Sequence, residues 1–217
     1  MNSEQWRAVD DYLNDLVIGP DEALDAAVAS VAAQGLPPIA VPPTHGKLLN
    51  LISRIHGARR VLEIGTLAGY STIWLGRALP ADGELITLEA DEKHARIASA
   101  NIGRAGLADR VEVRVGLALD TLPTLTGPFD LFFIDADKQH NPEYFEWALR
   151  LSRPGSVIIV DNVVRGGGVV DAASTDPAIV GTRRLGALIA GEPRVSATMV
   201  QTVSGKSYDG FCLAVVN

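Results

Sequence analysis

The chain contains, between residues 60 and 71, the stretch Arg60-Val61-Leu62-Glu63-Ile64-Gly65-Thr66-Leu67-Ala68-Gly69-Tyr70-Ser71. Its first half is a short apolar run typical of a buried strand, and two glycines then mark a turn into a helical pattern. The same alternation of strand and helix continues through most of the chain that follows. Such alternation predicts an α/β fold, in which helices cover both faces of a mostly parallel sheet.

Seven strands are expected. The first five alternate with helices, whereas the last two follow each other across the turn-like Ser204-Gly205-Lys206 and should pair antiparallel. The expected strands are Arg60–Ile64, Glu84–Leu88, Val111–Val115, Leu131–Ile134, Ser156–Val160, Val195–Val203 and Gly210–Val216. The expected helices between them are Gly69–Ala78, Glu92–Ala105, Ala118–Leu125, Pro142–Leu151 and Pro177–Ala190. The run Gly166-Gly167-Gly168 indicates a flexible local loop.

Three helices are expected before the first strand, at residues 4–18, at residues 22–35 with Asp21 as the cap, and at residues 44–56. A proline-rich linker at residues 36–43 separates the second helix from the third. We therefore expect a single domain over residues 1–217, with N-terminal helices at 1–57 and the sheet core at 58–217.

Composition limits the classes of function. The chain has 19 basic and 26 acidic residues, a formal net charge of −7, which argues against nucleic acid or an anionic membrane surface as a partner. No apolar run is long enough for a membrane span, and the acidic, amphipathic N-terminus is unlike a signal peptide. The single cysteine, Cys212, lies in an apolar run and cannot form a disulfide within the chain, which favours a cytoplasmic location.

The ends of the first two expected strands carry features of a cofactor site. Ligands of open parallel sheets bind beyond the carboxyl ends of the strands. Gly65 and Gly69 would let the backbone approach a ligand closely, and Ser71 lies in the first turn of a helix, where free N–H groups can bind a carboxylate. Glu89 ends the second strand, where an acidic residue can accept two hydrogen bonds from a ribose diol. A tight turn and an exposed glutamate would explain each feature separately, but the combination favours a cofactor.

The spacing of the glycines indicates which cofactor. Gly65 and Gly69 are separated by three residues, whereas a dinucleotide site needs Gly-x-Gly-x-x-Gly so that a second glycine lies close to the pyrophosphate. With the acidic Glu63 inside the strand as well, this spacing disfavours NAD and favours an adenosyl cofactor without phosphates. Glu63 itself could orient the glycine loop or approach the sulfonium or amino group of the cofactor.

The ends of the fourth and fifth strands carry a candidate metal site. Asp135 follows the fourth strand, and Asp161 and Asn162 follow the fifth, so neighbouring strand ends should bring them to one mouth of the sheet. Two carboxylates and an amide oxygen suit Mg²⁺, Mn²⁺ or Ca²⁺ and suit Zn²⁺ poorly. Each residue alone could equally be a polar loop residue that caps a helix.

Lys138 lies three residues after Asp135 and could act as a base. Methyl transfer to oxygen needs a deprotonated hydroxyl, which a metal favours and a nearby amine can help to produce. The alternative is a surface cation that pairs with Asp137.

Together these residues resemble the cation-dependent O-methyltransferase family that includes caffeoyl-CoA and catechol O-methyltransferases. The resemblance extends over nearly the whole chain and implies a Rossmann-like class I methyltransferase with a seven-stranded sheet, often a homodimer, with S-adenosylmethionine as the cofactor. It rests on the segments Glu63–Ser71, Ile134–Lys138, Asp161-Asn162 with Gly166–Gly168, and Tyr208–Phe211.

The resemblance also implies roles for individual residues. Lys138 would be the base, and Asp135 and Lys138 would contact the substrate, a small catechol-like or phenolic hydroxyl acceptor. The metal, Mg²⁺ with Mn²⁺ or Ca²⁺ as alternatives, would be held by Asp135, Asp161 and Asn162. The cofactor would be surrounded by Val41, Gly65, Thr66, Ser71, Glu89, Ala118 and Asp135, to which the strand and turn patterns add Glu63 and Gly69.

Two positions depart from the family pattern. Asn141 and Leu67 stand where tyrosine is frequent in relatives, and the first departure lies on the substrate side, so the acceptor stays open. Residues 165–175 could cover the substrate, because their glycines would allow movement. His45, His56 and His94 are scattered without metal-ligand spacing and are expected in surface or helix roles.

Three other functions are compatible with parts of the pattern. A metal-independent methyltransferase acting on nitrogen or carbon would not need the oxygen ligands, and a non-catalytic cofactor-binding module would not need Lys138. A nicotinamide-dependent oxidoreductase is the least compatible with the glycine spacing.

Overall fold

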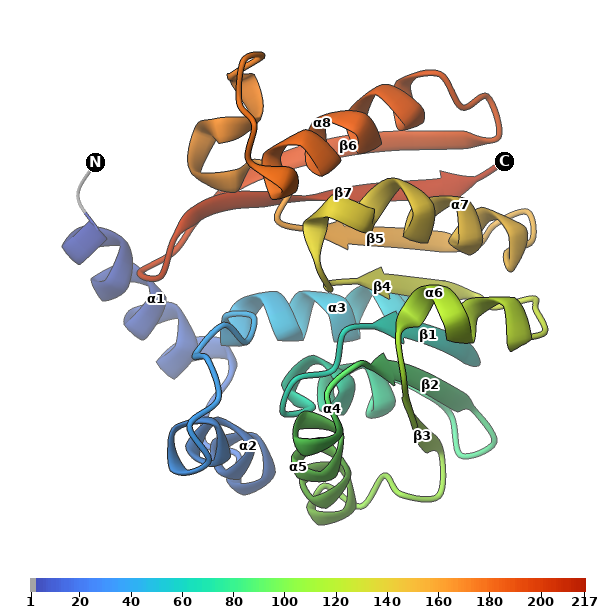
Figure 1. The fold of residues 1–217 in the computed structure, drawn as a ribbon. Coiled ribbons are helices and arrows are strands. Elements are labelled where there is room, and N and C mark those ends of the chain that lie inside the picture. Colours follow the sequence, from blue (N-terminus) through green and yellow to red (C-terminus); the bar gives the residue numbers. More distant parts are fainter. Residues whose placement is uncertain (1–2) are drawn as a thin grey trace.

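The computed structural model describes residues 3–217 and contains a seven-stranded sheet with the order β3-β2-β1-β4-β5-β7-β6 (Figure 1). The first five strands are parallel, whereas β7 runs antiparallel to both β5 and β6. The predicted fold class is therefore confirmed. The strands are β1 Arg60–Ile64, β2 Glu84–Glu89, β3 Val111–Val115, β4 Leu131–Ile134, β5 Val157–Asp161, β6 Val195–Val203 and β7 Tyr208–Val216.

Helices pack on both faces of the sheet (Figure 1). Side chains of α2, α3, α4 and α5 join the apolar cluster on one face, and those of α7 and α8 join the cluster on the other. The helices are α1 Ser3–Val17, α2 Glu22–Ala33, α3 Pro43–His56, α4 Tyr70–Gly76, α5 Glu92–Arg104, α6 Ala118–Thr121, α7 Asn141–Arg150 and α8 Pro177–Ala190, with short 3₁₀ turns η1 Leu122–Thr124, η2 Lys138–His140 and η3 Arg165–Val170.

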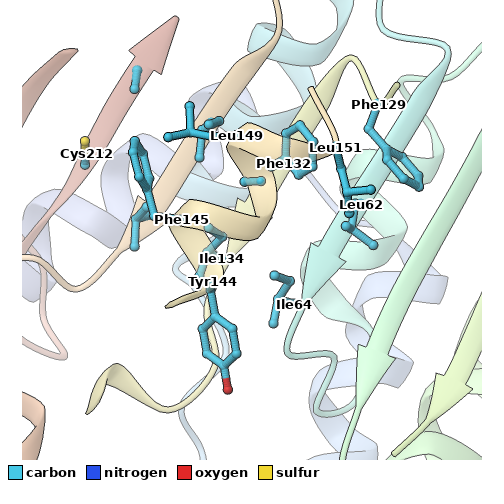
Figure 2. Close-up of a cluster of buried hydrophobic side chains, with 14 of the residues drawn as sticks. Leu62, Ile64, Phe129, Phe132, Ile134, Tyr144, Phe145, Leu149, Leu151 and Cys212 are labelled. Atoms are coloured by element: carbon cyan, nitrogen blue, oxygen red, sulfur yellow. The ribbon is translucent and has the colours of Figure 1, made fainter. Parts of the chain in front are cut away.

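The strands are apolar on both sides because both faces are covered. Successive side chains of β1 point to opposite faces, so Val61 joins the cluster beneath α2–α5 and Leu62 joins the one beneath α7 and α8. Figure 2 shows this second cluster, in which Phe145 of α7 packs over the sheet near the buried Cys212 of β7. The hydroxyl of Tyr144 points away from the other side chains drawn, so α7 contributes both to the core and to the polar surface beyond it.

The order of the strands reverses between β1 and β4, which is where open α/β sheets bind ligands. The chain leaves β1 toward β2 and β3 on one side, and β4 and β5 lie on the other. The backbone N–H of Asp135 donates to the carbonyl of Ile64 at 2.8 Å, so the ends of the two central strands stay joined at this point.

The differences from the expected elements are small and have local causes. Strand β7 begins at Tyr208 rather than Gly210, because Tyr208 pairs with Val203 directly next to the turn of the hairpin. The glycine run expected as a flexible loop lies instead in η3, where Gly166 and Gly167 adopt left-handed angles of φ 64° and 91°. Glycine takes such angles without steric strain, so the run makes a tight turn rather than an extended loop.

The far end of the C-terminal hairpin is tied to the N-terminal helix (Figure 1). The N–H of Gly205 donates to the Asp10 carboxylate at 2.6 Å, and a side chain at position 205 would meet Arg7. Among residues 3–217, no helix is both long and apolar enough to cross a membrane.

Candidate active site

A cavity of about 990 Å³ lies at the carboxyl ends of β1, β2 and β4. Its wall brings together residues that are up to about 140 positions apart in the sequence, as expected where parallel strands end side by side. Of the predicted site residues, the wall contains Val41, Gly65, Thr66, Ser71, Glu89, Ala118, Asp135, Lys138 and Asn162. Glu63, Gly69 and Asp161 lie outside the wall.

The loop after β1 passes so close to β4 that only glycine fits at its start. Gly65 has φ 97°, and a Cβ added there would lie 2.4 Å from the carbonyl oxygen of Asp135. Gly69 then takes φ 81° as the N-cap of α4, against Ala98. Gly65 therefore places bare backbone at the cavity, which is the feature that a closely bound ligand needs, and Gly69 turns the chain into α4 behind it.

Glu89 holds the same loop from the end of β2. Its carboxylate accepts hydrogen bonds from the backbone N–H groups of Thr66 at 3.2 Å and Leu67 at 2.8 Å, and it lies 3.7 Å from the ring of His94. Glu89 is nearly buried yet contributes to the cavity wall. It can therefore fix the loop with some of its lone pairs and accept from a ligand diol with the others.

Glu63 has a structural partner for each of its two oxygens. Ser71 and Thr72, in the first turn of α4, donate their hydroxyls to the Glu63 carboxyl group. The side chain is fully buried, and burial raises the pKa of Glu63 to about 7 against the opposing effect of these hydrogen bonds. This geometry fits the first of the two predicted roles, orientation of the glycine loop and its helix.

Three residues other than glycine have left-handed backbone angles in the described chain, and all three contribute to the cavity wall. They are Leu67, Asn162 and Arg165, with φ of 51°, 60° and 55°. Such angles cost about 1–3 kcal/mol for most side chains and persist where the surroundings impose them, often at functional sites. Their concentration around one cavity points to that cavity as the functional site.

The predicted metal ligands lie at the ends of adjacent strands. Asp161 is buried, and its desolvation and the charge of Asp135 raise the pKa of Asp161 well above its usual range. The N–H of Asn162 donates to Asp161 at 2.8 Å, which fixes the carboxylate beside the cavity. Within residues 3–217 no cluster of three or more His, Cys, Asp or Glu side chains is arranged to hold a metal, so a cation here would depend on the amide oxygen of Asn162 as the third ligand.

Two carboxylates and an amide fit a hard divalent cation chemically. The mutual repulsion of Asp135 and Asp161 in a poorly solvated place is the condition that a bound cation would relieve.

Lys138 pairs with Asp135 rather than with Asp137. Its Nζ donates to the Asp135 carboxylate at 2.5 Å, and the side chain is only 9% exposed. Asp137 accepts instead from the hydroxyl of Tyr144 at 2.5 Å and lies against His140. The alternative of a solvated surface lysine is therefore wrong.

His45 joins this site, although its sequence position alone gives it no role. The ring lies at the start of α3, with Nδ1 3.9 Å from the Asp161 carboxylate and Nε2 buried without a hydrogen-bond partner. Burial lowers the pKa of His45, which favours the neutral ring. Phe133 and Phe211 hold the imidazole, at 6.4 and 5.4 Å between ring centroids. The available signal is its place in the sequence: His45 lies four residues after Val41, a predicted cofactor residue.

The strand order and a glycine loop at the switch point define the chain as a Rossmann-like α/β protein with a cofactor-type cavity. Comparison with known proteins narrows this class. The family model described as O-methyltransferase matches residues 19–214. A catechol O-methyltransferase of Niastella koreensis is 52% identical over all of both chains, and one of Mycobacterium tuberculosis is 54% identical over 96% of this chain and 94% of its own.

A solved structure agrees with these relatives. The O-methyltransferase of Bacillus cereus, crystallised with S-adenosylhomocysteine (SAH), is 59% identical over all of both chains and superposes with a TM-score of 0.98. The chain therefore belongs to the O-methyltransferase family, which confirms the predicted family and enzyme class.

We expect His45→Phe to weaken Mg²⁺ binding by about 10- to 100-fold, the usual effect of losing a residue that orients a metal ligand. Phenylalanine keeps a ring between Phe133 and Phe211 but removes the nitrogen that faces Asp161. His45→Asn, whose amide nitrogen can replace Nδ1, should keep more of the affinity. Calorimetric titration with Mg²⁺ measures both.

The matched control is His56→Phe, at the other end of the same helix α3. It should bind Mg²⁺ as the unmodified protein does. Equal affinity of the His45→Phe protein would show that His45 does not act on the metal site.

Proposed function

We propose that this chain is an S-adenosylmethionine-dependent and divalent-metal-dependent O-methyltransferase that methylates one hydroxyl of a small catechol-like acceptor. The observation that carries the proposal is the position of Asp135. Its backbone closes the glycine cradle at Gly65, and its side chain pairs with Lys138 beside Asp161. One residue thus joins a place for an adenosyl donor to a place for a metal and a hydroxyl.

The methyl donor is supported by the loop after β1 and by a relative. The backbone at Gly65 and Thr66 leaves space for an adenosyl group, and Glu89 suits its ribose diol. The B. cereus relative was crystallised with SAH, the demethylated form of the donor. Val41, Ala118 and Ser71 complete the proposed contacts from other parts of the cavity wall.

The metal would be held by Asp135, Asp161 and Asn162. A divalent cation there would supply Lewis-acid chemistry, which favours the deprotonated form of an acceptor hydroxyl. Mg²⁺ suits an oxygen-only set best, because it retains several positions for water and substrate oxygens.

The chain's own residues then perform three tasks. The strand ends keep the donor and acceptor places in one continuous cavity, and alignment is the main requirement of a methyl displacement. In its neutral amine form, Lys138 accepts the acceptor's hydroxyl proton at Nζ, and the adjacent Asp135 carboxylate stabilises the ammonium that forms. Asp135 holds Lys138 in position and contacts the substrate beside it.

A catechol-like acceptor is supported by two curated relatives named catechol O-methyltransferase at 52% and 54% identity. A metal-independent methyltransferase or a non-catalytic binding module would have no use for the Asp135–Lys138 pair beside Asp161. The proposed enzyme explains all three residues together.

Turnover of a catechol panel with S-adenosylmethionine should require added Mg²⁺ and should disappear with EDTA. Chromatographic detection of the methylated product measures this, and an excess of Mg²⁺ over EDTA should restore it. Equal product with and without EDTA would contradict the metal role of Asp135, Asp161 and Asn162, and would leave a metal-independent methyltransferase.

Lys138→Ala should lose most of the turnover, on the order of 10²–10⁴-fold as for other general bases, while keeping the affinity for S-adenosylmethionine. The hydrogen bond of its side chain goes to Asp135 and not to the glycine loop, so donor binding should not depend on it. Single-turnover kinetics and calorimetry measure the two quantities. A near-normal rate across the pH range would show that Lys138 is not the base.

We also propose that the enzyme is a homodimer that pairs through α1. This helix buries none of its residues in the single chain and exposes an apolar stripe of Val9, Tyr12, Leu13 and Leu16. Light scattering should give about twice the chain mass of 23.0 kDa, and Leu16→Glu should reduce it to one chain. Asp11→Ala, on the polar side of α1, is the control. A single-chain mass for the unmodified protein would contradict the proposal.

A further inference from the structure

Arg165 is a cation of the cavity wall whose side chain has no hydrogen-bond or ion-pair partner within residues 3–217. It begins η3, three residues after the predicted ligand Asn162, so it lies on the acceptor side of the cavity rather than at the glycine loop. Its Nε is buried without a hydrogen-bond partner, and its guanidinium forms no ion pair with any residue of the described chain. An unpaired guanidinium is a strong donor set that a ligand can use.

The other charged side chains of the cavity wall are already engaged. Each carboxylate has a cation, a hydroxyl or a backbone N–H as its partner, and Lys138 has Asp135. The pairs are Glu89 with the loop N–H groups and His94, Asp135 with Lys138, Asp137 with Tyr144 and His140, and Asp176 with the N–H of Ala178. The positive charge of Arg165 is therefore the one left over for a ligand among the described residues of the wall.

The backbone that carries Arg165 is held in place on both sides. The N–H groups of Val164 and Arg165 both donate to one oxygen of Asp209, at 2.9 Å each. Farther along η3, Arg183 of α8 donates to the carbonyl of Val169 at 2.7 Å. These contacts impose the left-handed angle of Arg165, φ 55°, and so fix the direction in which its side chain leaves the chain.

We infer that Arg165 binds a carboxylate on the acceptor, so that the enzyme prefers catechols that carry a carboxylate over neutral catechols. This inference rests on the proposed function and names the substrate class of that same site. A planar guanidinium presents paired N–H groups that match the two oxygens of a carboxylate, and such charge-assisted pairs are among the strongest hydrogen bonds. Held at a fixed angle, Arg165 would also select which of the two hydroxyls faces Lys138.

The test compares an acid with its neutral ester. The kcat/KM for 3,4-dihydroxybenzoate is divided by that for its methyl ester, with S-adenosylmethionine and Mg²⁺ present, and the same ratio is measured for 3,4-dihydroxycinnamate. Comparing this ratio between variants cancels the different chemical reactivity of acid and ester. For Arg165→Gln we expect the ratio to fall by about 10-fold or more, as expected for a lost charge-assisted hydrogen bond.

The matched control is Arg184→Gln, which removes the same charge from the neighbouring helix α8, where Arg184 pairs with Glu143 and does not contribute to the cavity wall. Its acid-to-ester ratio should equal that of the unmodified enzyme, so a fall confined to Arg165→Gln excludes a general effect of net charge. Calorimetric titration of each variant with 3,4-dihydroxybenzoate in the presence of SAH provides a second readout without turnover, and it should show weaker binding for Arg165→Gln alone.

The outcomes separate this inference from the proposed function. Turnover of catechols with an acid-to-ester ratio that Arg165→Gln leaves unchanged would overturn the role of Arg165 and keep the methyltransferase. A fall of equal size in Arg184→Gln would overturn it as well. No methylation of any catechol by the unmodified protein would overturn both the proposed function and the inference built on it.

Discussion

The close approach of two backbones, at Gly65 and Asp135, is the constraint on which the site depends. The central strands β1 and β4 end side by side at the reversal of strand order, and a Cβ at position 65 would lie 2.4 Å from the Asp135 carbonyl oxygen. Only glycine fits at position 65, because any side chain would collide with the backbone of Asp135. The fold itself therefore brings the glycine loop and Asp135 together. Glu89 from β2, the hydroxyl pair of Thr66 and Thr87, and the Asn101 amide on the Ala68 carbonyl hold the loop around this point.

The charged side chains next to Asp135 are arranged in neighbouring pairs. Lys138 neutralises Asp135, and the buried Asp161 lies beside them with His45 at 3.9 Å. Two carboxylates with a single ammonium, which pairs with Asp135, are incomplete as a structural ion-pair cluster, since the desolvated Asp161 forms no ion pair with a Lys or Arg among the described residues. The same arrangement is complete if a divalent cation is added. Asp135, Asp161 and Lys138 are thus better explained by the proposed catalysis than by stability.

The sequence was sufficient for the fold and for the residues at strand ends, because strand and helix periods are local signals and parallel strands always end at the same edge. That is why Gly65, Glu89, Asp135 and Lys138 could be placed in advance. His45 could not, since its contact with Asp161 joins residues more than a hundred positions apart through the packing of α3. Arg165 was assigned only to a covering loop, because its left-handed angle is imposed by Asp209 from the last strand.

The residues that the sequence pattern left out lie mainly on the acceptor side, and this follows from how the two sides are built. The donor side uses backbone and strand-end residues, which any sequence with this fold must supply near the switch point. The proposed acceptor side is closed by η2, η3 and α8, whose side chains meet only after the sheet has formed. Specificity for an acceptor can therefore change through a single wall residue such as Arg165 without disturbing the donor cradle, so relatives that share this fold can differ in substrate at this wall.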